Sequence, residues 1–324
     1  PDAGRLSREL QTPVAPPKAG VTVTLPNVSR DAVQPGGLSV TLSAVNFTGN
    51  TVLSQEQLQA FVQPAIGQSR DLAGLYDIAD QVSGYYRAQG YAFAKVFLPQ
   101  NGFRDGVLTL QVVEGSYGER TAKADTASRS AQAQRFLEPL KKGSAIYAPD
   151  LERRTLILDD QPGYDALPVI KPGQTVGTGD LDVTLTPTQK ITGSVSVSNH
   201  GNRYTGYYQA RANVVINSPL MFGDQLSYSV MGSDERLQSS NINYSLPLGG
   251  SGLRATAGYS RTEYRLAREF ANLHVSGTAQ TGTLGLSYPL IRSRVANLTA
   301  SLQGQHKRFY DEQVTVNAQQ ARQS

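Results

Sequence analysis

The chain has 324 residues, with 30 Lys and Arg against 26 Asp and Glu and a net charge of +4. It contains no Cys and no Trp, which excludes a disulfide framework, a thiol nucleophile and any Cys-ligated metal site. The positive charges are scattered, so nothing argues for a nucleic-acid partner, and no apolar stretch approaches the length of a membrane helix.

Residues 1–37 predict an N-terminal helix followed by an extended linker. Leu6 and Leu10 lie four apart, on one face of a short helix over 1–11. Residues 12–37 are rich in Pro, Gly and Val, which indicates an extended linker, with a disordered tail as the alternative. The chain begins without Met and without a signal peptide, so we expect a processed or truncated chain.

Residues 38–115 predict a compact βααββ module. After a strand over 39–47, Ser54 can cap a helix whose apolar residues are Leu58, Phe61 and Val62. Asp71 then opens a longer helix with an apolar stripe at spacings of three and four: Leu72, Leu75, Ile78, Ala79, Val82 and Tyr86.

The end of this module predicts two more strands. Gly90 ends the long helix in the manner of a C-cap. Strands over 91–98 and 107–113 follow, separated by turn residues rich in Asn, Asp and Gly.

Residues 116–188 predict the same order in weaker form. Helices are expected over 132–141 and 149–158, and strands over 166–170 and 179–185. Two βααββ units in tandem indicate an array of modules.

Residues 189–324 predict an array of strands. One face of the first strand is apolar and the other is hydroxylic: Ile191, Gly193, Val195 and Val197 oppose Thr192, Ser194, Ser196 and Ser198. The same alternation returns in 208–216, 241–248, 283–290 and 296–303.

This strand array favours a transmembrane β-barrel. The runs are near the length of a tilted membrane strand, the polar face carries mainly hydroxyl and amide groups, and tyrosines recur at the ends of runs. A soluble β-sandwich is the alternative. We count about seven strands, whereas a single-chain bacterial barrel has an even number of at least eight, so we expect an incomplete barrel.

Several motifs carry a resemblance to a known family. They are FTGNTVLS, YYRAQGY and VVEG in the first module, LERRTLILDDQPGY and IKPGQTVGTGDLDVTL in the second, and VSNHGNRYTGYYQARANVVINSPLMFGDQLSYS at the start of the strand array. The chain resembles a TpsB transporter, the outer-membrane partner in two-partner (type V) secretion, of the haemolysin/haemagglutinin activator type. The resemblance covers nearly the whole chain, but the family's loop motif that folds back into the barrel has no counterpart in these residues.

The resemblance implies an α+β pair of POTRA modules in the periplasm, followed by part of an antiparallel β-barrel in the Gram-negative outer membrane. It implies a translocator that recognises an unfolded TpsA-type exoprotein, of the adhesin or haemolysin class, and passes it through the barrel without ATP. The lipid bilayer is the other expected partner. An outer-membrane protein assembly factor of the same superfamily is the alternative, and a soluble β-sandwich binding protein is a less favoured one.

The sequence predicts no enzyme, no metal site and no cofactor. His200, His274 and His306 lie far apart and have no ligand partners at a useful spacing. Asp159 and Asp160 form an acidic pair, but LDDQPGY is typical of a helix end that runs into a Pro-Gly turn. No nucleophile-elbow or phosphate-loop motif is present.

The strand predicted over 91–98 is the candidate partner-binding site. An unpaired strand edge beside the second helix can accept an extended peptide by backbone pairing. The expected residues are Tyr85, Tyr91, Phe93, Lys95, Val96 and Phe97. The alternative is that both faces of this strand are half-buried in a small sheet.

Overall fold

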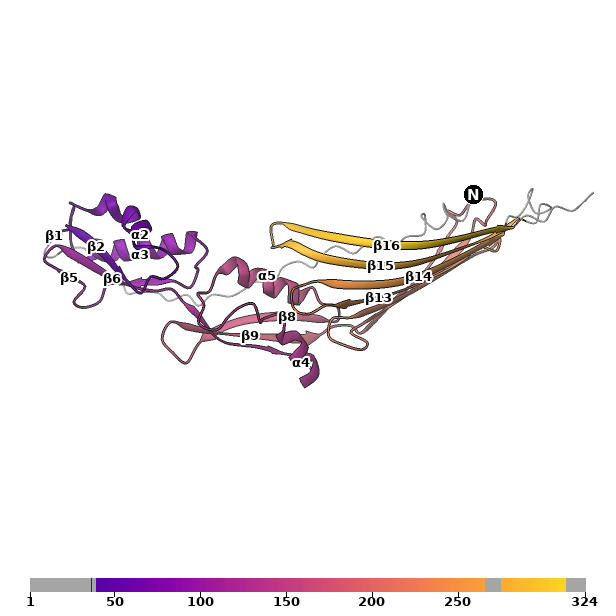
Figure 1. The fold of residues 1–324 in the computed structure, drawn as a ribbon, viewed down its shortest axis with the longest axis horizontal. Coiled ribbons are helices and arrows are strands. Elements are labelled where there is room, and N and C mark those ends of the chain that lie inside the picture. The colour runs from indigo at the N-terminus through magenta and orange to yellow at the C-terminus, as the bar shows by residue number, and fades with distance from the viewer. Residues whose placement is uncertain (1–35, 37–38, 266–274, 313–324) are drawn as a thin grey trace, which may run out of the picture.

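The computed structural model describes residues 36, 39–265 and 275–312. The predicted helix over 1–11, nearly all of the linker and His274 lie outside the described residues. The molecule is elongated: two small α/β modules follow one another and lead into a long, curved antiparallel sheet (Figure 1). No helix in the described part of the chain is long and apolar enough to cross a membrane.

The first module contains β1 (Val40–Thr41), β2 (Ala44–Thr48), α2 (Gln55–Val62), the 3-10 helix η1 (Gln63–Ala65), β3 (Ser69–Arg70), α3 (Leu72–Ala88), β4 (Lys95–Phe97), β5 (Phe103–Arg104) and β6 (Val107–Val113). Its main sheet has the order β2-β6-β4, with β2 parallel and β4 antiparallel to β6. The predicted strand over 39–47 is split in two. The predicted strand over 91–98 shrinks to the three residues of β4, because turns occupy 92–93 just after the helix end.

The helix caps follow the sequence prediction. Ser54 caps α2 and forms a reciprocal capping box with Gln57. The carboxylate of Asp71 accepts a hydrogen bond from the Gly74 N–H at 2.9 Å at the start of α3, and backbone donors of this kind hold the pKa of Asp71 below its usual value. Most of the predicted stripe of α3 is buried, but Leu72 is 49% exposed because it occupies the first helical position, which faces water.

Glu114 belongs to the motif VVEG and connects it to the motifs FTGNTVLS and YYRAQGY. Its carboxylate accepts hydrogen bonds from the backbone N–H groups of Thr51 and Val52, at 2.7 and 2.9 Å, and from the hydroxyl of Tyr86 at 3.1 Å. Gly49 approaches the same strand end with φ +82°, and a Cβ there would lie 2.5 Å from the Val112 carbonyl oxygen. The buried Glu114 therefore holds the FTGNTVLS loop against the end of β6.

The second module contains β7 (Ser116–Lys123), α4 (Ala127–Gln134), α5 (Ala148–Asp159), β8 (Tyr164–Pro172) and β9 (Thr178–Pro187), and its sheet has the order β7-β9-β8. The predicted helix over 132–141 is misplaced. Thr126 caps α4 earlier in the chain, and residues 135–139 form turns. The strand β7 is the first strand of the predicted βααββ order, for which no bounds were predicted.

The rest of the described chain forms one sheet of seven strands in sequence order: β10 (Ile191–Ser198), β11 (Gln209–Asn217), β12 (Gln225–Ser233), β13 (Gln238–Pro247), β14 (Arg254–Arg265), β15 (Ser276–Arg292) and β16 (Asn297–Glu312). Every neighbouring pair is antiparallel. The predicted count of about seven antiparallel strands is confirmed.

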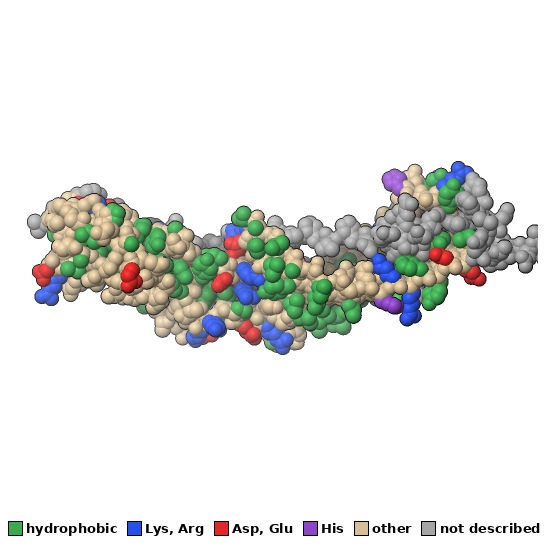
Figure 2. Space-filling model, turned by 45° about the horizontal axis from the view of Figure 1, so that its top comes forward, with side chains coloured by type: hydrophobic (Ala, Val, Ile, Leu, Met, Phe, Trp, Pro, Cys, Tyr) green, Lys and Arg blue, Asp and Glu red, His purple; other side chains and the backbone are tan. Residues whose placement is uncertain are grey.

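The register of this sheet separates an apolar face from a polar one. Val214, Tyr228, Ile242 and Tyr259 lie side by side in one row. These four side chains are 40 to 46% exposed, so no second sheet within the described residues covers this face. On the surface shown in Figure 2, apolar side chains gather where the second module meets the sheet. An uncovered apolar face suits a sheet that faces lipid, not a soluble sandwich.

Candidate functional site

The strand β4 lies at the edge of the first module's sheet. It pairs with β6 on one side, and among the described residues no strand pairs with its other side. The open side faces α3. The backbone N–H of Val96 donates a hydrogen bond to the Ser83 Oγ of that helix at 2.9 Å, and the Ser83 hydroxyl in turn donates to the Ala79 carbonyl at 2.8 Å. The edge is therefore open to a strand, but a helix side chain already binds the Val96 donor.

The six residues expected at the docking site occupy three places. Lys95, Val96 and Phe97 form β4, where Val96 is buried under α3 and Phe97 is 37% exposed. Lys95 and Phe97 face the opposite side of the sheet from Val96, because side chains alternate along a strand.

The other three expected residues lie around β4. Tyr85 belongs to α3 and stacks on Phe61 of α2, with ring centroids 4.5 Å apart. Tyr91 lies at the boundary between the modules, 5.4 Å from the ring of Tyr147, and Phe93 packs against the core of the second module. The structure thus brings three of the six residues together on the edge and places Tyr91 and Phe93 at the module boundary.

A second edge strand, β8 in the second module, is protected. Its Ala166 N–H donates to the Asp159 carboxylate at 2.8 Å, and Pro168 has no N–H to offer. On each of these edges a side chain therefore binds one outward-facing N–H, Ser83 on β4 and Asp159 on β8, and an added strand would have to take over that donor. The edge of β4 differs in carrying an exposed aromatic side chain, Phe97.

The structure also shows a joint between the second module and the long sheet. The turn between β11 and β12 inserts Phe222 into the core of the second module, where its ring lies 5.0 Å from Tyr164 and 5.9 Å from Phe136. The Phe222 N–H donates to the side-chain oxygen of Gln132 at 2.8 Å. The core of the second module is completed by a residue of the sheet.

The motif LERRTLILDDQPGY supplies the polar half of this joint. Asp160 forms a two-point ion pair with Arg292 of β15, at 2.6 and 2.8 Å, and the Arg292 side chain is only 4% exposed. Arg153 donates to the carbonyls of Leu290 and Pro289 at 2.9 and 2.8 Å. The two acidic residues therefore have different structural roles. Asp160 binds Arg292 of the sheet, and Asp159 accepts a hydrogen bond from the Ala166 N–H of β8.

A further charged contact lies beside Phe222. The Tyr164 hydroxyl donates to Asp125 at 2.7 Å, and this bond holds the pKa of the Asp125 carboxyl below its usual range. Burial raises the pKa of Tyr164 to about 12. Arg129 pairs with the other oxygen of Asp125 and donates to the carbonyl of Ser218 in the same turn, at 3.0 Å. The ion pair therefore ties α4 to the sheet.

The joint was missed in the sequence analysis, although one signal for it is present. The turn SPLMFGD places Leu220, Met221 and Phe222 between two membrane-type strands, where polar turn residues are normal. Apolar residues in such a turn indicate that it is covered by another part of the molecule.

No group of three or more His, Asp or Glu side chains suited to a metal ion occurs among residues 36, 39–265 and 275–312. His200 lies in a turn and His306 on β16, each on a different part of the sheet.

Comparisons with known proteins agree with this architecture. A family model described as POTRA domain, ShlB-type, matches residues 40–115, and a model described as haemolysin secretion/activation protein ShlB/FhaC/HecB matches residues 177–324. The chain is 26% identical over 334 residues to the heme/hemopexin transporter protein HuxB of Haemophilus influenzae, covering 99% of this chain and 58% of that protein. It is 26% identical over 264 residues to the outer membrane transporter CdiB of Escherichia coli, covering 79% and 44%.

Two solved structures share the fold. CdiB from Escherichia coli superposes with a TM-score of 0.71 at 24% identity, over 88% of this chain and 54% of that chain. CdiB from Acinetobacter baumannii superposes with a TM-score of 0.62 at 20% identity, over 96% and 61%. The chain spans little more than half the length of these relatives.

The Asp160–Arg292 pair should set the strength of the joint. Asp160→Ala leaves a buried guanidinium without its partner, which costs about 3 kcal/mol. We expect faster limited proteolysis of the second module in the detergent-solubilised protein. The double variant Asp160→Arg with Arg292→Asp should recover part of the protection. Lys171→Gln, which removes an exposed pair with Asp182, is the matched control and should change the rate little. Equal proteolysis rates for Asp160→Ala and Lys171→Gln would show that the Asp160–Arg292 pair does not stabilise the joint.

Proposed function

Because the chain belongs to the TpsB family of outer-membrane transporters, the ShlB/FhaC/HecB haemolysin secretion and activation proteins, we propose that the full-length protein secretes one exoprotein across the outer membrane. In this proposal two POTRA modules lie on the periplasmic side and the strands of the long sheet lie in the membrane; the family match over residues 40–115 supports the first module. The proposed protein recognises its partner unfolded in the periplasm, passes it through a closed β-barrel, and has no enzymatic activity.

One observation carries this proposal. Two small modules with an open strand edge lead directly into a sheet that has one uncovered apolar face and one face of hydroxyl and amide groups. Lipid against the first face and an extended chain along the second satisfy both surfaces. No phosphate-binding motif occurs in the sequence, and we propose that folding of the partner outside the cell drives its passage.

We propose the division of the chain into residues 1–37, 38–115, 116–188 and 189–324. Separate buried clusters in the first and second modules support the two central units. In this division residues 1–37 carry an N-terminal helix and linker, and residues 189–324 supply the first strands of the barrel.

The family transports secreted exoproteins of the TpsA type, and we propose a partner of the adhesin or haemolysin class. The relatives include a heme/hemopexin transporter and a hemolysin transporter protein, HpmB of Proteus mirabilis. The name of HpmB supports a haemolysin-class protein as the cargo, and the lipid bilayer is the second proposed partner.

Deletion of the full-length gene tests the function. We expect one large exoprotein to disappear from the medium while other outer-membrane proteins assemble at normal levels, which quantitative proteomics of both fractions measures. Restoring the gene should restore the exoprotein. A general loss of barrel proteins would point to an assembly factor and contradict the proposal.

We propose that an extended segment of the partner adds to the open side of β4. Lys95 and Phe97 then read alternate side chains of the partner, and the Val96 backbone pairs with it. Tyr85, Tyr91 and Phe93 shape the surroundings of this edge. Since Ser83 Oγ holds the Val96 N–H, the incoming strand has to take over that donor.

Two variants of the first module should change partner affinity in opposite directions. Phe97→Ala removes an exposed aromatic contact and should weaken binding by about 1–2 kcal/mol. Ser83→Ala frees the Val96 donor and should strengthen binding. Both are measured as the Kd of the identified exoprotein for the full-length protein in detergent.

Leu167→Ala on the protected strand β8 is the control for these two variants. It removes an exposed aliphatic side chain from the other edge and should leave the Kd unchanged. If Leu167→Ala weakens binding and Phe97→Ala does not, the recognition surface lies on the second module.

A further inference from the structure

The apolar face ends at the side of the sheet that is far from the two modules, and its last apolar residue can be identified on each strand. This end is called the upper limit. On β10 the outward-facing residues remain apolar as far as Val197, whose row ends on β16 at Tyr310. On β16 itself the last outward-facing aliphatic residue is Leu302. From β10 to β16, the upper limit therefore moves toward the modules by one to one and a half residues at each strand. With a rise of ~3.3 Å per residue and ~4.8 Å between strands, this corresponds to a strand tilt of roughly 35–45°, as in membrane barrels.

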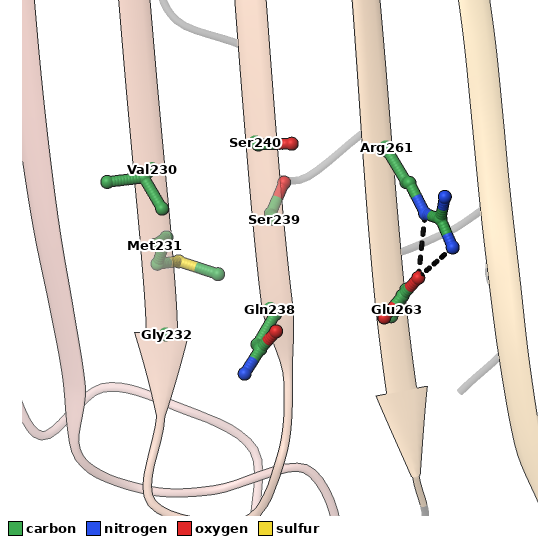
Figure 3. Close-up of a pocket in the computed structure, with 8 residues that line it drawn as sticks. All are labelled: Val230, Met231, Gly232, Gln238, Ser239, Ser240, Arg261 and Glu263. Atoms are coloured by element: carbon green, nitrogen blue, oxygen red, sulfur yellow. Dashed lines mark hydrogen bonds and ion pairs between the residues drawn. The ribbon is translucent and has the colours of Figure 1, made fainter.

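A hollow of about 470 Å³ lies on this limit, across β12, β13 and β14 (Figure 3). Its apolar side is Val230, and the row below it, with Tyr228, Ile242 and Tyr259, continues the apolar face. A Cβ on Gly232 would meet nothing within 4 Å, so the floor of the hollow is open.

The opposite side of the hollow is polar. Arg261 and Glu263 stand next to each other on β14, with side chains 50% and 42% exposed, and the Arg261 Nε donates to Glu263 at 2.6 Å. The Nη2 of Arg261 also contacts the Glu263 carboxylate, whereas Nη1 makes no hydrogen bond to the residues that the structure describes. Arg261 lines the hollow, and Figure 3 shows its guanidinium on the side of β14 that faces away from Gln238 and Ser240. Ser240 and Gln238 add hydroxyl and amide groups from β13.

The geometry points to a headgroup site for a phosphorylated glycolipid of the outer leaflet, lipopolysaccharide. Its acyl chains lie against the Tyr228–Ile242–Tyr259 row, and its phosphate accepts hydrogen bonds from the Nη1 of Arg261, which has no partner among the described residues. Gln238 and Ser240 are placed for the sugar hydroxyls. The hollow joins an apolar wall to a cation at the membrane surface, and this combination fits a lipid rather than a soluble anion. The inference depends on the membrane placement of the sheet and is independent of the secretion mechanism.

The test compares lipopolysaccharide retained per full-length protein after extraction from outer membranes. Arg261→Gln should lower retention severalfold, because it removes the charge-assisted contact to phosphate. Glu263→Gln removes the competing carboxylate and should raise retention. Arg211→Gln is the matched control: Arg211 pairs in register with Met231 and therefore faces the other side of the same sheet.

Titration of the purified protein in nanodiscs with fluorescent lipopolysaccharide separates phosphate recognition from acyl binding. The wild type should bind dephosphorylated lipopolysaccharide as weakly as Arg261→Gln binds intact lipopolysaccharide. The affinity for dephosphorylated lipopolysaccharide should change little in Arg261→Gln. Unchanged retention in Arg261→Gln, or an equal loss in Arg211→Gln, would overturn the site. Exoprotein secretion should be normal in Arg261→Gln and Glu263→Gln, whose side chains lie on the apolar face, so failure here leaves the transport proposal standing.

Discussion

The apolar face of the seven-stranded sheet is the constraint on which the rest of the structure depends. Side chains such as Tyr228, Ile242 and Leu302 point away from the polar face, and nothing in the described part of the chain covers them. Exposure of such a face to water is unfavourable by roughly 25 cal/mol for each Å². Lipid removes this cost, and β10 and β16 each keep one side without a strand partner among the described residues.

A sheet held in a bilayer gives the periplasmic modules a fixed base. Phe222 completes the core of the second module from the sheet side, and Asp160 and Arg292 add a partly buried ion pair. The second module and the sheet therefore share side chains, whereas the first module keeps its own core and an edge strand at the far end of the molecule. This division places the proposed recognition edge away from the membrane and the anchoring contacts next to it.

Sequence patterns predicted the features that depend on local periodicity. The alternation of apolar and polar residues located the membrane strands, and Ser54 and Asp71 marked the two helix starts, because both signals act within a few residues. The strand predicted over 91–98 was too long, because residues 92–93 form a turn and only residues 95–97 form a strand. The insertion of Phe222 depends on a contact between distant segments: the apolar turn SPLMFGD indicates that part of it is covered, but no local pattern shows which segment covers it.

Alternate cysteine substitutions on β13 test the account most directly, because the 324 residues contain no Cys. In the full-length protein in outer membranes, Asn241→Cys and Asn243→Cys should react with a membrane-impermeant maleimide. Ile242→Cys and Leu246→Cys should be protected, and a fluorophore placed there should be quenched by nitroxide lipids. Labelling of 242 and 246 from water, without quenching by lipid, would contradict a lipid-facing sheet.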